Sequence, residues 1–346
     1  MSRVFKDWKL LIGLAIAAFC LFLAFRKVDF AQMWAAFQQM NYWYLLPALA
    51  IMFFSHWLRA LRWRYFLAPI HKVDLKTLYS SLLIGYMANT FLPAHLGEFI
   101  RAYLVGKRYP IPGSSVFATI VIERIIDVFT LLTLMAVTII VFPFPAWVRQ
   151  SGYISFAFIF VLLVALWLMK RYRTRATKVL NVILKPLPSH LSHKINELLH
   201  SFLDGVVGLK NWRHYIIVGI LSLAIWFCYG YIFQIGLHAF NFVELYNTPW
   251  MTPLVLLVIT TIAILVPSSP GYVGTYHYLC QISLGFFGVP ESDALTFAFV
   301  IHGINFLPIL LVGLVLVTVM GMNLKSIQSE AAREAQEIDE ELETAT

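Results

Sequence analysis

Long apolar runs alternate with short polar segments along most of the chain. Runs of about 18–25 apolar residues recur, and this is the length that an α-helix needs to cross the hydrocarbon core of a bilayer. A shorter, weakly amphipathic run at residues 28–40 is expected to lie at the membrane interface. The pattern therefore predicts an all-α polytopic membrane protein with about six full spans, at residues 8–25, 43–67, 116–141, 153–169, 215–239 and 294–320.

Two further apolar segments, at residues 75–105 (the first hairpin) and 251–287 (the second hairpin), are interrupted by proline and glycine. Proline removes a backbone hydrogen-bond donor, and glycine lowers the cost of a turn. Unwound backbone at membrane depth is tolerated only where it lines a cavity or is buried in protein. We therefore expect each segment to enter and leave by one face as a re-entrant helical hairpin. Two oppositely oriented hairpins are the arrangement expected of an inverted repeat.

The distribution of basic residues favours this topology. With a cytoplasmic N-terminus, the cytoplasmic regions hold 22 Lys and Arg residues and the exterior regions hold 3. Cytoplasmic loops of membrane proteins carry such an excess, so we expect both termini in the cytoplasm and the chain in the cell inner (plasma) membrane. The cytoplasmic regions counted are residues 1–9, 59–76, 101–108, 170–213 and 321–346.

The expected domain organisation follows from this topology. The predicted transmembrane domain, with its spans and hairpins, occupies residues 1–321 and includes a cytoplasmic basic loop at 170–213. Residues 322–346 form an acidic cytoplasmic tail, which is most simply a solvated end of the chain.

The composition mainly excludes other classes of protein. Of the 346 residues, 60% are hydrophobic and 13% are charged, against about 25% charged in soluble domains. A soluble enzyme, a nucleic-acid-binding domain and a disordered protein are therefore not expected. The three cysteines lie in apolar segments without the spacing of a disulfide framework or a zinc site. We find no Gly-rich nucleotide loop, no triad spacing and no metal motif, so no cofactor or metal is expected.

The first candidate site lies at the break of the first hairpin and contains Asn89, Pro93, Gly97, Glu98 and Arg101. Glu98 and Arg101 are three residues apart, so they can pair on one helical face. A half-helix that begins near Leu96 points the positive end of its dipole at the break, which favours an anion. The pattern indicates a headgroup or phosphate site with Arg101 as the anion contact. The alternative is a structural ion pair that fixes the hairpin.

The second candidate site is Glu123, Arg124 and Asp127, inside the predicted span 116–141. Glu123 and Asp127 are four residues apart and share a helical face. Charged residues inside a span usually face the bundle interior and meet partners there, and Arg101 and Arg59 are the candidate partners. One interpretation is a buried salt-bridge cluster that orients helices, and the other is a substrate or proton relay. Arg59 either faces the cavity or extends to the cytoplasmic interface.

The third candidate site is the break of the second hairpin, with Pro270, Gly271, Gly274 and His277. These prolines and glycines free backbone amides and carbonyls, and a half-helix is expected to start after Gly274. The combination indicates a second anion nest, and the alternative is a simple kink. His302, in the last predicted span, is interpreted as a core histidine whose hydrogen bonds are satisfied.

These three motifs, in this order, resemble those of the lysylphosphatidylglycerol synthase transmembrane family, also called flippase-like domain proteins. The resemblance covers about residues 10–320. It implies a polytopic fold with re-entrant helices and, as in the best-known members, lipid translocation between leaflets. It also implies that the motif residues bind the substrate. The multiple peptide resistance factors of this family fuse the domain to a soluble aminoacyl transferase that modifies phosphatidylglycerol.

Two departures from the family pattern matter. After Met320 the sequence has only a short acidic segment in place of a synthase domain, so we expect no lysyl transfer and no enzyme activity of that kind. Many members also carry Glu three residues after the last glycine of the third motif, and here that residue is His277. This difference predicts a changed headgroup preference or pH response.

The leading hypothesis is therefore a lipid translocase with a charged midplane cavity. Its expected partners are membrane lipids with an anionic or polyprenyl-phosphate headgroup, and not nucleic acid; homo-oligomer formation is left open. An intramembrane lipid-modifying enzyme and a non-catalytic membrane assembly subunit are the alternatives.

Overall fold

The computed structural model describes residues 8–91, 96–142, 211–265 and 270–321, and the single residues 157, 161, 164, 329 and 333. This part of the chain consists of eleven α-helices and two short 3-10 helices, and it contains no strand. The predicted all-α class is confirmed. The predicted span 153–169, nearly all of the basic loop 170–213 and nearly all of the tail 322–346 lie outside the described residues.

The helices follow the predicted order closely. The first half of the chain contains α1 (Trp8–Phe25), α2 (Phe30–Gln39), η2 (Tyr42–Tyr44), α3 (Leu45–Leu67), α4 (Leu75–Phe91), α5 (Gly97–Arg108) and α6 (Gly113–Val141). The second half contains α10 (Trp212–Ala239), α11 (Phe242–Leu245), α12 (Thr252–Leu265), η4 (Pro270–Tyr272), α13 (Thr275–Gly285) and α14 (Glu291–Val319).

Three stretches in the described part are long and apolar enough to cross a membrane: η2 with α3 (Tyr42–Leu67), α10 and α14. Helix α6 is as long as α14, with 29 residues, but it carries Glu123, Arg124 and Asp127 in its middle. A helix with three charges at its centre needs partners from its neighbours. The crossing of the membrane by α1 and α6 stays a prediction.

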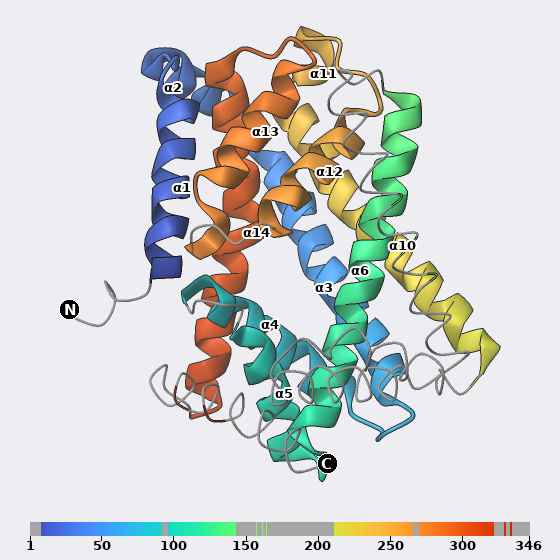
Figure 1. Cartoon of the computed structure of the whole chain (residues 1–346). Coiled ribbons are helices and arrows are strands. Elements are labelled where there is room, and N and C mark those ends of the chain that lie inside the picture. The colour runs from blue at the N-terminus through green and yellow to red at the C-terminus, as the bar shows by residue number, and fades with distance from the viewer. Residues whose placement is uncertain are drawn as a thin grey trace, which may run out of the picture.

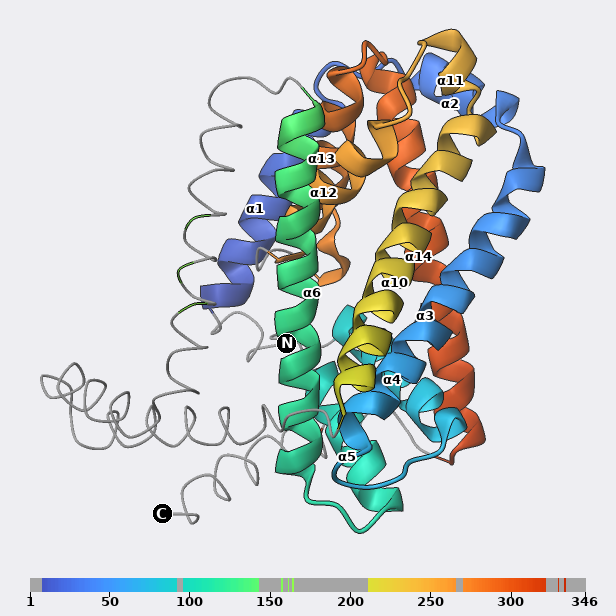
Figure 2. The same cartoon turned by 90° about the vertical axis from the view of Figure 1, so that its right-hand side faces the viewer.

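The two broken segments form two pairs of packed helices in opposite halves of the molecule (Figure 1). Helices α4 and α5 pack together in the lower half, and α12 and α13 pack together in the upper half. The long helices α3, α6, α10 and α14 run past both pairs, as the side view also shows (Figure 2). The 3-10 helix η4 packs against α4, so the second hairpin reaches the first. Re-entry of either hairpin into a bilayer stays a prediction.

The hydrophobic core is divided in the same way. One cluster of buried side chains joins α10, α12, α13 and α14, and it is centred on residues such as Trp226, Leu256 and Phe297. A second cluster joins α3, α4, α5 and α6 around Trp63 and Leu78. Each hairpin therefore has its own core, and the long helices connect the two.

A close backbone approach forms the inner end of the first hairpin. The side-chain oxygen of Asn89 accepts a hydrogen bond from the Gly97 amide at 2.8 Å, which satisfies a free donor at the start of α5. A Cβ atom on Gly97 would lie 2.0 Å from the carbonyl oxygen of Gly85. Only glycine allows α4 and α5 to come this close. Residues 92–95, which include Pro93, lie outside the described residues.

Polar contacts also join the two ends of this hairpin, at the start of α4 and the end of α5. Asp74 caps α4, because its carboxylate accepts hydrogen bonds from the amide of Thr77 at 2.8 Å and from the Thr77 hydroxyl at 2.6 Å. The hydroxyl of Tyr109, just after α5, donates to the same carboxylate. Partial burial opposes the charge on Asp74, but these hydrogen bonds outweigh it and lower the pKa of the carboxyl to about 2. Asp74 therefore joins the start of α4 to the end of α5.

The second hairpin turns through left-handed backbone. Gly271, Tyr272 and Gly274 have φ of 66°, 58° and 96°, values that glycine adopts readily and tyrosine rarely. A Cβ atom on Gly274 would lie 2.5 Å from the carbonyl oxygen of Ala17. Gly274 thus lets α13 pack directly on the backbone of α1. Residues 266–269 lie outside the described residues.

Candidate functional site

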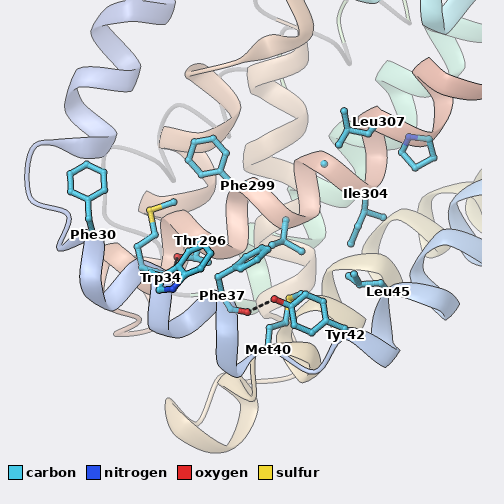
Figure 3. A pocket seen from close by; sticks show the side chains of 14 residues that line it. Phe30, Trp34, Phe37, Met40, Tyr42, Leu45, Thr296, Phe299, Ile304 and Leu307 are labelled. Carbon is cyan, nitrogen blue, oxygen red and sulfur yellow. Dashed lines mark hydrogen bonds between the residues drawn. The ribbon is translucent and has the colours of Figure 1, made fainter. Parts of the chain in front are cut away.

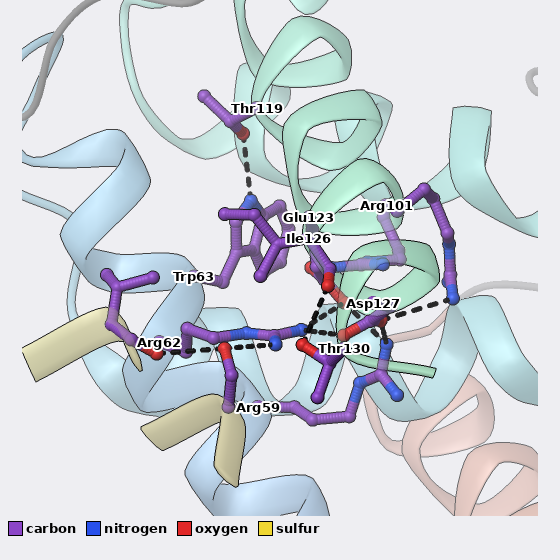
Figure 4. Close-up of polar contacts among 12 residues, drawn as sticks. Arg59, Arg62, Trp63, Arg101, Thr119, Glu123, Ile126, Asp127 and Thr130 are labelled. Carbon is purple, nitrogen blue, oxygen red and sulfur yellow. Dashed lines mark hydrogen bonds and ion pairs between the residues drawn. The ribbon is translucent and has the colours of Figure 1, made fainter. Parts of the chain in front are cut away.

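Four arginines and three carboxylates from α3, α5 and α6 form one connected network of ion pairs, called the ion cluster below (Figure 4). It lies between the first hairpin and the long helices. Its members are Arg59, Arg62, Glu98, Arg101, Glu123, Arg124 and Asp127.

Glu123 is the centre of the ion cluster. Its side chain has no exposed surface, and each of its two oxygens meets a different arginine. Arg59 Nη2 lies 2.8 Å from Oε1, and Arg101 Nη2 lies 2.8 Å from Oε2. A buried carboxylate is tolerated only when it is paired and hydrogen-bonded in this way. Glu123 therefore joins α6 to both α3 and α5.

Asp127 lies one turn along α6 from Glu123 and extends the cluster toward α10. Its carboxylate accepts hydrogen bonds from Arg59 at 2.5 Å and from Arg62 at 2.7 Å. Arg62 is fully buried, and its other terminal nitrogen donates to the Ser222 hydroxyl on α10 at 2.9 Å. The predicted pairing of α6 with Arg59 is confirmed, and Arg59 does not extend to an interface.

Arg101 is enclosed on every side that the structure describes. Its side chain has no exposed surface, and it pairs with Glu98 at 3.0 Å and with Glu123. The guanidinium lies 4.3 Å from the centroid of the Trp63 ring, a cation–π contact. Gly85 on α4 makes room for it, because a Cβ atom there would lie 2.5 Å from Arg101 Cγ. The predicted Glu98–Arg101 pair is confirmed, and the role of Arg101 as an anion contact stays a prediction.

Arg124 has the most accessible side chain of the cluster. It is 40% exposed, whereas the other three arginines are less than a tenth exposed. It pairs with Glu98 and reaches Asp127 only at 4.0 Å. Its guanidinium lies 6.0 Å from the ring of Tyr86 on α4. The Tyr86 hydroxyl is buried and has no hydrogen-bond partner among the described residues. The Arg124 guanidinium thus lies close to the ring that carries this buried, unpartnered hydroxyl.

The ion cluster carries an excess of positive charge. Four guanidinium groups face three carboxylates, which leaves one positive charge without a counter-charge in the cluster. At membrane depth an uncompensated charge is costly, and it attracts an anion strongly because little water screens it. The arrangement can therefore bind a singly charged anion beside Arg124.

The second hairpin has a different, uncharged site. His277, buried in α13, accepts the Gly274 amide at its Nδ1 at 3.2 Å, while its Nε2 has no partner among the described residues. The ring of His302 on α14 lies 4.8 Å away between centroids. His302 Nε2 is hydrogen-bonded to the carbonyl oxygen of Gly271 at 2.9 Å. The predicted hydrogen-bonded state of His302 is confirmed.

The structure separates the predicted site residues into two groups. Arg59, Glu98, Arg101, Glu123, Arg124 and Asp127 meet in the ion cluster, with Asn89 and Gly97 closing the hairpin beside it. Gly271, Gly274 and His277 lie at the turn of the second hairpin, with the backbone of Pro270 in η4. The side chain of Pro270 is not described.

Sequence reasoning missed Arg62 and Tyr86. Arg62 lies near the end of a predicted span, so the distribution of basic residues assigns it to the cytoplasm together with Arg59 and Arg101. Their burial in the ion cluster reduces the cytoplasmic count from 22 to 19 against 3 outside. The missed signal is that Arg59 and Arg62 are three residues apart on one helical face. Tyr86 offered no signal of its own in an apolar run.

No group of three or more His, Cys, Asp or Glu side chains within the described ranges is arranged to hold a metal ion. The guanidinium groups of the ion cluster offer charge recognition. Arginine binds phosphate and carboxylate through paired N–H donors.

Comparison with known proteins adds a family and three relatives. Residues 10–313 match the family model described as lysylphosphatidylglycerol synthase TM region. A UPF0104 membrane protein of Methanothermobacter thermautotrophicus is 26% identical over 270 residues, which cover 72% of this chain and 77% of that one. A UPF0104 membrane protein of Methanocaldococcus jannaschii is 23% identical over 262 residues, with the same coverage. The glycosyltransferase AglD of Haloferax volcanii is 32% identical over 98 residues, which are 28% of this chain and only 16% of that protein.

Proposed function

The chain belongs to the lysylphosphatidylglycerol synthase transmembrane-region family, and on this premise we propose that it moves a phosphate-bearing lipid between the two leaflets of a membrane. The lipid is a phospholipid or a polyprenyl-phosphate-linked lipid. The observation that carries the proposal is the excess positive charge of the ion cluster beside the partly exposed Arg124.

Charge balance supports a phosphodiester as the transported group. A phosphodiester carries one negative charge, and the ion cluster has one positive charge in excess. The two together are neutral, which lowers the cost of holding a headgroup at membrane depth. Arg124 would bind the phosphate oxygens, and the free hydroxyl of Tyr86 would donate a hydrogen bond to them. Glu98 would remain paired with Arg101.

The topology proposed for this function has six full spans and two re-entrant hairpins that open to opposite faces. Both termini and the basic loop would lie in the cytoplasm of a cell with the protein in its inner membrane. The packing of η4 against α4 supports a meeting of the hairpins near the level of the ion cluster. Broken helices that meet at the midplane are a recurrent way to build a substrate site in transporters.

Lipid movement in reconstituted vesicles tests the proposal. Fluorescent phosphatidylglycerol in the inner leaflet becomes accessible to an external quencher only after it crosses. We expect Arg124→Gln to lower the initial rate by about tenfold or more, since a hydrogen bond to a charged group contributes about 1.5–3 kcal/mol. Arg64→Gln is the matched control, because Arg64 is an exposed arginine of α3. Equal rates for Arg124→Gln and the wild type would overturn the assignment.

Mass spectrometry of the same vesicles separates transport from chemistry. A transported lipid keeps its mass, whereas a lipid-modifying enzyme changes it. The partial likeness to a protein named as a glycosyltransferase makes this comparison necessary. A product of altered mass that depends on the protein and on Arg124 would replace the transport proposal with an enzymatic one.

A further inference from the structure

An apolar groove lies between α2 and α14, away from the ion cluster (Figure 3). Its volume is about 600 Å³, and none of the residues that line it is charged. Helix α14 separates it from the turn of the second hairpin, since His302 faces Gly271 while Gly303 and Leu307 line the groove. The groove is therefore distinct from the proposed phosphate site.

The groove is open because neither wall is closed by side chains. Helix α2 has no buried residue, and its aromatic residues Phe30, Trp34 and Phe37 are 66%, 61% and 37% exposed. In the opposite wall, Gly303 has no side chain, and a Cβ atom there would meet only Leu307 Cδ1 at 3.9 Å. An apolar surface of this kind fits an apolar occupant.

Polar contacts hold α2 in place beside the groove. The amide of Asp29 donates to the Ser292 hydroxyl at 3.0 Å, and the Gln32 side chain donates to Asp293 at 3.4 Å. Both contacts join the start of α2 to the first turn of α14. These contacts therefore fix the position of α2, whose aromatic side chains line the groove.

The dimensions of the groove match one leaflet of a bilayer. It runs along α14 from Thr296 to Pro308, and at 1.5 Å per residue this is about 18 Å. One leaflet contributes about half of the roughly 30 Å hydrocarbon core. Trp34, which is 61% exposed, lies near the Thr296 end (Figure 3). Exposed tryptophans mark the headgroup level, so the groove leads from that level toward the midplane.

The hydrogen-bonding groups of the groove disfavour an extended peptide. Its two hydroxyl donors are already used, because Thr296 donates to the Ser292 carbonyl at 2.8 Å and Tyr42 donates to the Phe37 carbonyl at 2.7 Å. A bound extended peptide would leave its backbone groups unsatisfied in an apolar site, at a cost of several kcal/mol each. A hydrocarbon chain has no such groups. We propose that the groove binds one acyl chain of a membrane phospholipid.

This binding goes beyond the proposed transport. It also affects the packing of the second hairpin. Phe299 lines the groove, and its ring lies 4.1 Å from the ring of His277 between centroids. A chain in the groove therefore packs against a residue that also supports the turn of the second hairpin. The bound lipid acts as a structural ligand of α14 and not as the transported headgroup.

Photolabelling of the full-length protein tests the groove without any transport measurement. The protein is reconstituted with phosphatidylglycerol that carries a diazirine at the end of one acyl chain, irradiated and mapped by peptide mass spectrometry. We expect more adducts at Ile304 and Phe37, which line the groove, than at Leu311. Leu311 is exposed on α14 outside the groove. Gly303→Leu fills the groove and should lower these adducts by about tenfold, equivalent to about 1.4 kcal/mol of binding free energy.

The control is Gly219→Leu, because Gly219 is exposed on α10 with no atom within 4 Å of its added Cβ. Leu307→Trp, which fills the groove from an exposed position, replaces Gly303→Leu if that variant does not fold. Equal labelling of Leu311 and Ile304 would overturn the proposal, as would labelling that both groove-filling variants leave unchanged. Cross-links from the groove to a second copy of the chain would also overturn it.

Discussion

The two hairpins are built alike and held differently. The α4–α5 hairpin is joined to α6 by ion pairs of Glu98 and Arg101, and α6 is joined in turn to α3. Helices α12 and α13 contain no charged residue, and their hairpin is held by backbone contact and neutral hydrogen bonds. Ion pairs among buried groups fix a register strongly, because breaking one leaves a charge unpaired. We therefore expect the first hairpin to stay fixed and the second to be the one that moves.

The largest expected effect comes from removing the charge that holds the first hairpin. Glu123→Gln leaves Arg59 and Arg101 without their shared counter-charge, which should cost about 3–5 kcal/mol in the free energy of unfolding. Thermal unfolding in detergent, followed by tryptophan fluorescence, measures the loss. Glu244→Gln, at an exposed residue of α11, is the control. An unfolding temperature equal to that of the control would show that charge does not hold this hairpin.

The corresponding change in the second hairpin is steric. Gly274→Ala places a Cβ atom 2.5 Å from the Ala17 carbonyl oxygen at a φ of 96°. Overpacking of this kind should cost about 1–3 kcal/mol, so the effect should be smaller than that of Glu123→Gln. The same unfolding measurement checks it. Gly285→Ala, in the same helix with nothing within 4 Å, should have little effect, and equal losses for the two alanine variants would contradict the packing argument.

The smallest expected effect on stability comes from Asp74, which joins the start of α4 to the end of α5 in the first hairpin. Its folded-state pKa of about 2 is below the ordinary 3.8, so its contribution to stability is complete above about pH 5. The contribution is lost as pH falls from about 4 toward 2, because the unfolded state takes up the proton first. The difference in unfolding temperature between the wild type and Asp74→Asn should therefore shrink between pH 6 and pH 3. A difference that grows on acidification would contradict this sign.

Helix boundaries could be predicted from the sequence where both ends are apolar. Helix α1 begins and ends at the predicted residues, and α4 begins where the first hairpin is predicted to begin. Helices α6, α10 and α14 each begin three residues earlier than predicted, because their first turns are more polar than the runs that follow. In α14 this turn contains Glu291 and Asp293, and acidic residues stabilise the start of a helix while lowering its hydropathy.

The candidate site could be predicted only where its pairs are close along one helix or are forced by burial. The Glu98–Arg101 pair follows from its spacing, and the need of Glu123 for an arginine follows from the cost of a buried charge. The burial of Arg62 could not be predicted, because it depends on how α10 brings Ser222 to it. The enclosure of Arg101 depends likewise on Trp63 and on the space above Gly85.

The ion cluster also constrains how the chain enters the membrane during synthesis. Helix α3, with Arg59 and Arg62, emerges from the ribosome well before α6, with Glu123 and Asp127. Each of these charges alone opposes partitioning into lipid by about 2.5–3.5 kcal/mol. With α6 spanning the membrane as predicted, we expect the arginines to be held at the translocation channel until their carboxylates arrive, and the two helices to leave it for the lipid together.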